Sequence, residues 1–204
     1  MPREPAQPRR RSSLRLRGFN YASPGAYFMT SCTWRNHSIL GDVVGGRVSL
    51  SPPGEIVTTC WKGISEHLPF AAVDVSIVMP NHVHGILFLQ GEGALVGSVG
   101  ATHAVSRRRA AGLRGTNGAS PLRVSGRPSG PQAASLSAVV GAFKAACSRL
   151  VNQYRGTPGA PVWQRGFHEQ VIRDEADLER IRRYIEHNPL RWAKDEEHPI
   201  RGHP

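Results

Sequence analysis

The chain has few cysteines and no long apolar run. Its three cysteines, Cys32, Cys60 and Cys147, are odd in number and widely spaced, which argues against a disulfide framework and against a structural zinc site. No apolar stretch approaches the roughly 20 residues of a membrane helix, and the basic N-terminus lacks the apolar segment of an export signal. We therefore expect one domain in the cytoplasm, with reduced thiols and no membrane partner.

Acidic residues are scarce beside basic ones. The sequence has 26 Lys and Arg against 15 Asp and Glu, a formal net charge of +11, and arginine, which suits bidentate phosphate contacts, greatly outnumbers lysine. The positive charge gathers in a tail over residues 1–17 and in a Gly-, Ser- and Pro-rich insert over 91–134. We expect both to be disordered arms that bind nucleic-acid phosphates, and a merely solubilising role is the alternative. The insert arginines expected to make these contacts are Arg107, Arg108 and Arg109.

Two histidines follow a turn at the start of an apolar strand in the segment MPNHVHGILFL, Met79–Leu89. Side chains alternate faces along a strand, so His82 and His84 project together. Two imidazoles on one face can hold one metal ion, at the point where the strand is expected to meet the surface. An arbitrary pair of this kind is more simply explained as two polar residues at a strand end, and it specifies neither metal nor reaction.

The C-terminal segment Val162–Trp192 predicts a short strand, a turn and a helix over about 175–188. Pro189 is expected to stop this helix. Tyr184 and Asn188 are one turn apart and therefore share a face, which presents a phenol and an amide oxygen together. The simpler explanation of the tyrosine is half-buried packing beside its neighbouring isoleucines.

The rest of the chain alternates between strand and helix patterns. The strands are expected over Ala26–Trp34, Arg47–Leu50, Ala72–Val78, Val83–Leu89 and Phe167–Ile172. Two further helices are expected over Pro53–His67 and Leu136–Tyr154. This order favours an antiparallel sheet with helices packed on it, an α+β architecture.

Together these segments resemble a known family, the single-tyrosine transposases of the IS200 type, and most closely the REP-associated tyrosine transposases of the HUH nuclease superfamily. The resemblance rests on MPN followed by His82 and His84, on VWQRGF before the last strand, and on RRYIEHNPLRW at the end. It covers roughly Arg11–Trp192 apart from the insert. It implies a ferredoxin-like fold for one catalytic domain over 18–194, followed by a tail over 195–204.

The resemblance also implies an activity: a metal-dependent single-stranded DNA endonuclease and strand transferase acting at or near hairpin-forming repeats. Tyr184 is the implied nucleophile, leaving a 5′-phosphotyrosine bond, and the implied ligands of Mg or Mn are His82, His84 and Asn188. The family often has glutamine where this sequence has Asn188. A phenol with an ordinary pKa of about 10 needs a metal or base to ionise, and no general base is evident. A bacterial, nucleoid-associated monomer or homodimer is implied.

Other residues are candidates for the same site. The rival tyrosines are Tyr154, Tyr27 and Tyr21, and packing explains the first two. His168 and Glu169 on the last strand are expected either to reach the site or to face solvent. The DNA contacts expected outside the insert are Trp163, Gln164, Arg165, Arg180, Arg182, Arg183 and Arg191. A buried tryptophan that anchors its loop, and a solvated arginine face of the helix, are the alternatives.

Two other functions compete with the nuclease. A DNA-binding protein on the same fold that no longer turns over predicts no covalent adduct, and unchanged DNA affinity after Tyr184→Phe. A hydrolase of small phosphodiesters releases its product without a protein adduct and has no need of basic arms. A tyrosine nucleophile is superfluous in that hydrolase, so it is the least favoured.

Overall fold

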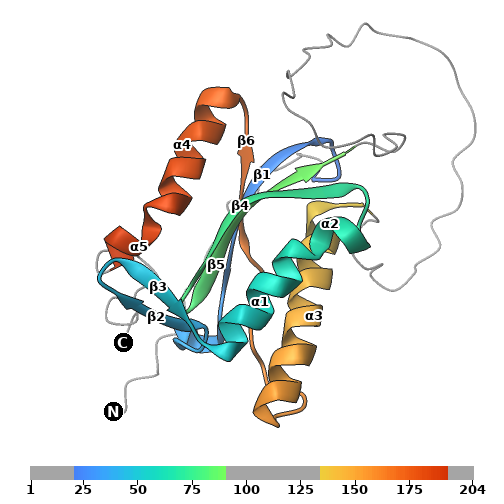
Figure 1. Cartoon of the computed structure of the whole chain (residues 1–204). Coiled ribbons are helices and arrows are strands. Elements are labelled where there is room, and N and C mark those ends of the chain that lie inside the picture. The colour runs from blue at the N-terminus through green and yellow to red at the C-terminus, as the bar shows by residue number, and fades with distance from the viewer. Residues whose placement is uncertain (1–20, 91–133, 193–204) are drawn as a thin grey trace, which may run out of the picture.

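The computed structural model describes residues 21–90 and 134–192. The tails expected over 1–17 and 195–204 lie outside the described residues, and so does the expected insert apart from its last residue, Ala134. The arginines of the insert, Arg107, Arg108 and Arg109, therefore have no place in the structural description that follows. The two described ranges together build a layered α+β unit (Figure 1).

Four antiparallel strands form the central sheet, in the order β4-β5-β1-β6 (Figure 1). The strands are β1 (Gly25–Cys32), β4 (Ala71–Met79), β5 (His82–Leu89) and β6 (His168–Ile172). β1 lies between β5 and β6 and pairs antiparallel with both, while β4 pairs antiparallel with β5. One long helix follows β1 before β4, and another follows β5 before β6. This is the ferredoxin-like arrangement, so the predicted fold class is confirmed.

Helices cover both faces of this sheet (Figure 1). Helices α1 and α3 pack on one face and on each other, whereas α4 packs on the other face. Among the described residues, none of the helices has the length and apolarity needed to cross a bilayer. The helices are α1 (Pro52–Lys62), α2 (Ile64–His67), α3 (Leu136–Arg155), α4 (Glu175–Glu186) and α5 (Asn188–Arg191).

Side-chain caps fix where the three long helices begin. Ser51, Ser135 and Asp174 each accept a hydrogen bond from the backbone N–H three residues further on, at 3.3, 3.2 and 2.9 Å. Each cap satisfies a backbone donor that has no partner within the helix. α3 ends at Gly156, whose left-handed φ of 64° suits glycine.

Two small elements lie at the end of the sheet where β1 stops and β5 begins. A single 3-10 turn, η1 (Trp34–Asn36), follows β1, and a hairpin of β2 (Gly41–Val44) and β3 (Arg47–Leu50) follows the turn. The hairpin tip approaches α5 so closely that a Cβ on Gly46 would lie 2.6 Å from Cδ2 of Leu190. The hairpin therefore lies beside the C-terminal helices, as Figure 1 shows.

The alternation of side chains along β5 sorts them between two cores. The core under α1 and α3 contains Val83, Leu87 and Leu89, and the core under α4 contains Ile86 and packs against Phe88. His82 and His84 have the same parity as Ile86, so their side chains point toward α4. The predicted sharing of one face by the two histidines is confirmed.

Two expected helices are interrupted. The helix expected over Pro53–His67 breaks at Gly63, a weak helix former, so α1 ends at Lys62 and a separate turn follows. The helix that carries the tyrosine ends at Glu186, and Asn188 begins α5. Pro189 has no N–H to donate to the carbonyl of Ile185 and its ring crowds that carbonyl, so the break precedes the proline.

Two further expectations are corrected by the structure. The strand expected to reach Trp34 ends at Cys32, and Trp34 begins the 3-10 turn. Tyr154 was expected to pack in the apolar stripe of its helix, but 59% of the residue is exposed, whereas Cys147 and Val151 of that stripe are fully buried. The last turn of α3 extends beyond the layers it covers (Figure 1), which leaves Tyr154 in solvent.

Candidate metal and tyrosine site

The two histidines of β5 lie side by side beneath the C-terminal helices. The ring centroids of His82 and His84 are 4.4 Å apart. Tyr184 of α4 lies against His84, with ring centroids 5.3 Å apart, and Trp192 lies against His82 at 5.9 Å. Because these two rings cover them, the imidazoles are 0% and 3% exposed, and the pair is buried where the sequence predicted a strand end at the surface.

Asn81 orients His82. The side-chain amide Nδ2 of Asn81 donates to the carbonyl oxygen of Asn36 at 3.2 Å, which identifies Oδ1 as the atom 2.9 Å from Nδ1 of His82. An amide oxygen only accepts, so Nδ1 of His82 carries a proton. A polar partner on one ring nitrogen, which fixes the orientation of the ring, is the usual support of a metal-binding histidine.

His84 is held from the neighbouring strand. Its Nδ1 lies 2.8 Å from Oγ1 of Thr30, the residue directly opposite it on β1. Burial, and then the charge of His82, hold the pKa of His84 well below the usual 6.5. The imidazole is therefore neutral at neutral pH, as a metal ligand must be.

Tyr184 combines contact with the histidines and access to solvent. Its hydroxyl oxygen lies 3.5 Å from Nε2 of His84, and the edge of its ring meets Phe28 with the ring planes at 86°. The residue is nevertheless 38% exposed. A nucleophile for a DNA strand must be reachable from outside, and this half-open position meets that requirement.

Asn188 is buried at the start of α5, with 1% exposure. Along the chain it lies between Tyr184, which contacts His84, and Trp192, which contacts His82. The break before Pro189 places it at the start of a separate short helix, so the prediction that the helix of Tyr184 continues to residue 188 is wrong.

The donor set fits a divalent metal ion. Within the described residues, no third His, Cys, Asp or Glu joins the two histidines. Remaining positions on an ion would fall to an amide oxygen, to water or to phosphate oxygens. Imidazole with oxygen donors suits a first-row transition ion such as Mn²⁺ better than Mg²⁺, which prefers oxygen alone.

The rival tyrosines lie elsewhere. Tyr27 is fully buried on the α3 side of the sheet, where its hydroxyl donates to the carbonyl of Ser23 at 2.7 Å. Burial and the neighbouring Tyr21 raise the pKa of Tyr27, which suits a packing residue. Tyr21 packs against the same core, and Tyr154 lies on the exposed end of α3. Tyr184 is the tyrosine that contacts the histidine pair.

The two candidate residues of β6, His168 and Glu169, lie on opposite faces of the sheet. His168 is opposite Thr30 on β1, and Thr30 is opposite His84, so His168 has the parity of the histidine pair and lies two strands away. Glu169 has the other parity and is buried on the α1 and α3 side. The structure therefore brings His168 to the site's face and takes Glu169 away from it.

The loop before β6 is tied down from both sides. Trp163 is 7% exposed, packs near Phe143 with ring centroids 6.0 Å apart, and bridges to Thr33. Nζ of Lys144 donates to the carbonyls of Gln164 and Gly166 at 2.7 and 2.6 Å. The burial of Trp163 agrees with the alternative that this tryptophan anchors its loop. Arg165 of the same loop is exposed.

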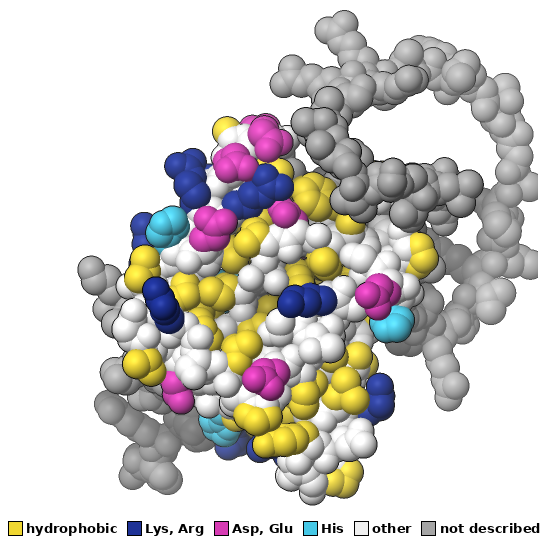
Figure 2. Space-filling model, viewed as in Figure 1, with side chains coloured by type: hydrophobic (Ala, Val, Ile, Leu, Met, Phe, Trp, Pro, Cys, Tyr) yellow, Lys and Arg dark blue, Asp and Glu magenta, His cyan; other side chains and the backbone are white. Residues whose placement is uncertain are grey.

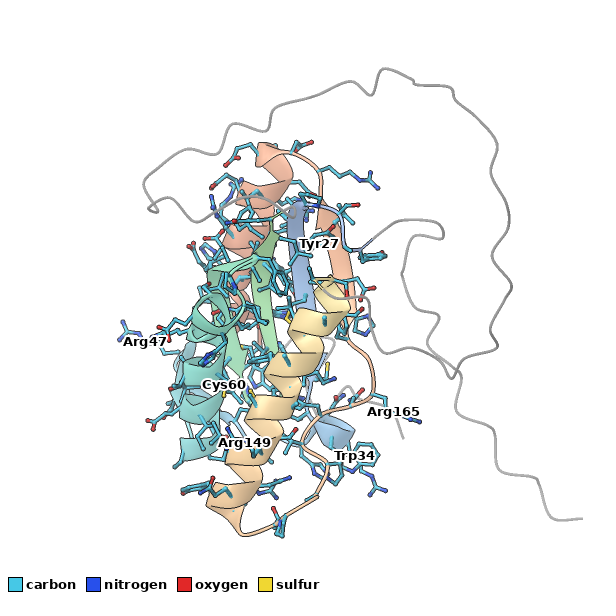
Figure 3. All side chains as sticks on the ribbon, turned by 90° about the vertical axis from the view of Figure 1, so that its right-hand side faces the viewer. Tyr27, Trp34, Arg47, Cys60, Arg149 and Arg165 are labelled. Atoms are coloured by element: carbon cyan, nitrogen blue, oxygen red, sulfur yellow. The ribbon has the colours of Figure 1, made fainter. Side chains whose placement is uncertain are left out.

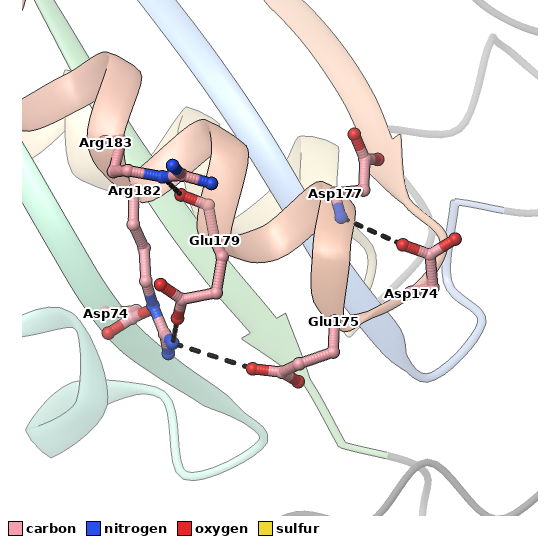
Figure 4. Close-up of polar contacts among 7 residues, drawn as sticks. All are labelled: Asp74, Asp174, Glu175, Asp177, Glu179, Arg182 and Arg183. Atoms are coloured by element: carbon pink, nitrogen blue, oxygen red, sulfur yellow. Dashed lines mark hydrogen bonds and ion pairs between the residues drawn. The ribbon is translucent and has the colours of Figure 1, made fainter.

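Arginines and carboxylates are interspersed on the outer face of α4 (Figures 2 and 4). Nε of Arg182 lies 2.8 Å from Oδ2 of Asp74, and its NH1 lies 2.7 Å from Glu179. The bonds to Asp74 and then Glu179 raise the pKa of Arg182. Arg180 pairs with Asp177. These two arginines are thus neutralised locally, whereas Arg183 and Arg191 are exposed.

Two supporting residues escaped the sequence-based prediction. Asn81 belongs to the turn before β5, and its position directly before His82 places its amide within reach of that ring. Thr30 had no sequence signal, because its contact with His84 depends on the register between β1 and β5.

The chain is similar to several known proteins over most of its length. No protein-family model matches it. An uncharacterised protein of Haemophilus influenzae is 29% identical over 188 residues, covering 91% of this chain and 92% of that protein. A REP-associated tyrosine transposase bound to a REP hairpin aligns with a TM-score of 0.51 and 16% identity, over 87% of this chain and 74% of that one. A structure from Deinococcus radiodurans R1 aligns with a TM-score of 0.42 and 16% identity, over 84% and 95%.

The alignment with a TM-score of 0.51 shows a shared fold. The chain has the ferredoxin-like, antiparallel architecture of a REP-associated tyrosine transposase. At 16% identity the likeness concerns the arrangement of strands and helices. The chemistry has to be argued from the site itself.

Proposed function

We propose that this chain is a metal-dependent single-stranded DNA endonuclease and strand transferase that acts at or near hairpin-forming repeats. Residues 18–194 are its proposed catalytic domain, and the basic insert over 91–134, with Arg107, Arg108 and Arg109, is its proposed phosphate-binding arm. The observation that carries the proposal is the 3.5 Å separation between the Tyr184 hydroxyl and Nε2 of His84. It joins an accessible nucleophile to the neutral imidazole of His84, which lies beside His82.

The proposed reaction balances without a co-reactant. The hydroxyl oxygen of Tyr184 attacks the phosphorus of a phosphodiester, and the bond between phosphorus and the 3′ oxygen breaks. The phenol gives up one proton and the departing 3′ oxygen takes one up. Because one phosphodiester bond replaces another, the 5′-phosphotyrosine keeps the energy needed to rejoin strands.

His82, His84 and Asn188 are the proposed ligands of Mn or Mg. When bound, the ion neutralises phosphate charge and lowers the cost of ionising the phenol. Asn81 and Thr30 hold the two imidazoles so that each presents its Nε2 atom. The ring of Tyr184 is steered by its edge contact with Phe28. Each of these positions is set by packing or by a hydrogen bond, as a preorganised site requires.

Surface charge supports a DNA strand as the substrate. Arg165, Arg183 and Arg191 are exposed, and no acidic residue of the described ranges forms an ion pair with any of them. They remain proposed phosphate contacts together with Gln164. Arg180, Arg182 and Trp163 have structural partners that they would have to leave in order to bind DNA.

The test is covalent capture of DNA. The full chain is incubated with Mn²⁺ and a labelled oligonucleotide that carries a hairpin with single-stranded flanks, and the products are separated on a denaturing gel. We expect a labelled protein band that requires Mn²⁺ and disappears in Tyr184→Phe and in His82→Ala. Tight binding across a panel of hairpins without any such band would overturn the proposal in favour of a binding protein.

A further inference from the structure

The turn that follows β1 has an uncommon backbone. Arg35 (φ 54°, ψ 26°) and Asn36 (φ 55°) are consecutive left-handed residues, and neither is glycine. Side chains crowd the backbone in this region, so such conformations persist only where the surroundings impose them. Asparagine tolerates the region and arginine does not share that preference.

The surroundings impose the conformation through three segments. The carbonyl of Asn36 accepts from Asn81, and its side-chain oxygen accepts from Nε2 of Gln164. The N–H of Trp34 donates to the carbonyl of Val162 at 2.8 Å. The turn is therefore a rigid support, built from the start of the β5 motif and from the loop before β6.

This support presents an aromatic ring and two cations to solvent. Trp34 is 38% exposed, and the guanidinium carbon of Arg35 lies 5.8 Å from the centroid of its ring. Arg165 is exposed on the adjoining loop, and Figure 3 shows it at the same end of the molecule as Trp34. Neither Arg35 nor Arg165 has an acidic partner among the described residues, unlike Arg182 on α4.

The same hydrogen bonds connect the turn to the histidine pair. Asn81 bonds to Asn36 through Nδ2 and to His82 through Oδ1. Cys32, two residues before Trp34, is directly opposite His82 in the sheet. Thr33, between them, has an extended backbone, so the Cα atoms of Cys32 and Trp34 are about 7 Å apart. That is a length of one to two nucleotides of a DNA strand.

We propose that Trp34, Arg35 and Arg165 form a stacking platform for one unpaired base that flanks the phosphate held at the histidine site. An unpaired base has both faces open, so it can stack on an indole or on a guanidinium plane, whereas a paired base within a duplex does not. Arg165 holds the adjacent backbone phosphate. The position of the DNA strand in this proposal rests on the proposed function, but the platform binds the base whether or not the strand is cleaved.

Binding is measured with the full chain carrying Tyr184→Phe, so that no strand is cut. The probe is a fluorescent DNA hairpin with a single-stranded 5′ or 3′ flank, and a blunt hairpin serves as the reference. Trp34→Leu keeps an apolar side chain but removes the aromatic face. We expect at least 10-fold weaker binding of the flanked hairpin, as the loss of one base stack predicts, and an unchanged affinity for the blunt hairpin.

Three further variants separate stacking from folding and from general charge. Trp34→Phe keeps an aromatic face and should bind within about 3-fold of the parent. Arg173→Ala removes an exposed arginine at the opposite end of β6 and should leave the difference between flanked and blunt hairpins unchanged. Arg35→Gly relieves the left-handed backbone, so it should raise Tm while weakening the flanked hairpin several-fold. A turn with only a structural role predicts the higher Tm without the loss of binding.

Photocrosslinking locates the base directly. 5-iodouracil is placed at each flank position in turn, and crosslinked peptides are identified by mass spectrometry. We expect one position to crosslink to Trp34. Equal binding by Trp34→Leu and no crosslink at Trp34, with Tyr184 adducts still formed by the wild type, would overturn the platform and leave the nuclease intact. A crosslink and weaker binding without any adduct would leave the platform intact and overturn the nuclease.

Discussion

The Tyr184 hydroxyl lies 3.5 Å from Nε2 of His84, although the two residues are 100 positions apart and belong to α4 and β5. That separation is long for a hydrogen bond. It brings the phenolic oxygen to the imidazole nitrogen itself, beyond the contact between the two rings. Removing the phenolic oxygen alone therefore tests the chemistry without disturbing the ring contacts.

Tyr184→Phe should abolish the covalent adduct and leave the fold intact, because Phe28 still packs against the remaining ring. We expect DNA affinity within about 2-fold of the parent and a Tm within about 2 °C. Fluorescence anisotropy and thermal melting measure the two quantities. Tyr154→Phe is the matched control, since Tyr154 is exposed on α3 and away from the histidines, and it should keep the adduct. Loss of adduct in both variants would contradict the assignment.

Asn81→Ala should weaken metal binding although Asn81 is not a proposed ligand. It removes the acceptor that orients the His82 ring through Nδ1, and loss of such supporting bonds typically lowers metal affinity about 10- to 100-fold. Calorimetric titration with Mn²⁺ measures the effect. Asn152→Ala is the control, because it also removes a buried amide, one that donates to the carbonyl of Ala160 at 2.8 Å away from the site. Both should lose about 1–3 kcal/mol of stability, and only the first should lose Mn²⁺ affinity.

Gly85→Ala should destabilise the fold by about 3 kcal/mol, because a Cβ there would lie 2.2 Å from Cζ2 of Trp61. Trp61 cannot retreat, since it is 2% exposed and packs edge-on against Phe143. Gly141 is on the exposed side of α3, where an added Cβ would have no atom within 4 Å. Gly141→Ala should therefore raise the free energy of unfolding by about 1 kcal/mol. Urea unfolding of both variants compares the two effects. A neutral Gly85→Ala would show that the ring lies elsewhere.

Cys60 should react as a thiolate near neutral pH. A hydrogen bond with Cys147 lowers the pKa of Cys60 to about 7, with a smaller lowering by Arg149 and an opposing effect of burial. Only the thiolate is nucleophilic, so alkylation by iodoacetamide should rise about 10-fold per pH unit below pH 7 and level off above pH 8. The same interaction raises the pKa of Cys147, which should stay unmodified. Arg149→Gln should move the midpoint upward, and a midpoint of about 8.5 in the wild type, the value of a free thiol, would contradict the contact.

Sequence patterns correctly predicted those features of the fold that depend only on neighbouring residues. Alternation placed His82 and His84 on one face because side chains alternate between faces along every strand. Long-range packing decided the rest. The exposure of Tyr154 depends on how far α3 extends past its neighbours, and the partner of His84 depends on strand register.

The sequence predicted the residues of the site itself, but not the residues that hold them in place. Pro189 correctly indicated a helix end. The helix ends before the proline, at Glu186, so Asn188 belongs to α5 and not to α4. The left-handed turn at Arg35 and Asn36 contains no glycine, the residue that would have indicated it in the sequence. It exists because three segments from different parts of the chain hold it, which no local pattern can express.

The most direct test of the tyrosine mechanism is the identity of the residue that carries DNA. Protein trapped with the flanked hairpin and Mn²⁺ is digested with protease and nuclease, and the nucleotide-bearing peptide is sequenced by tandem mass spectrometry. We expect a single phosphodiester-linked residue, Tyr184, within the segment of α4. A nucleotide on Tyr21, Tyr27 or Tyr154, or on a residue other than tyrosine, would contradict it.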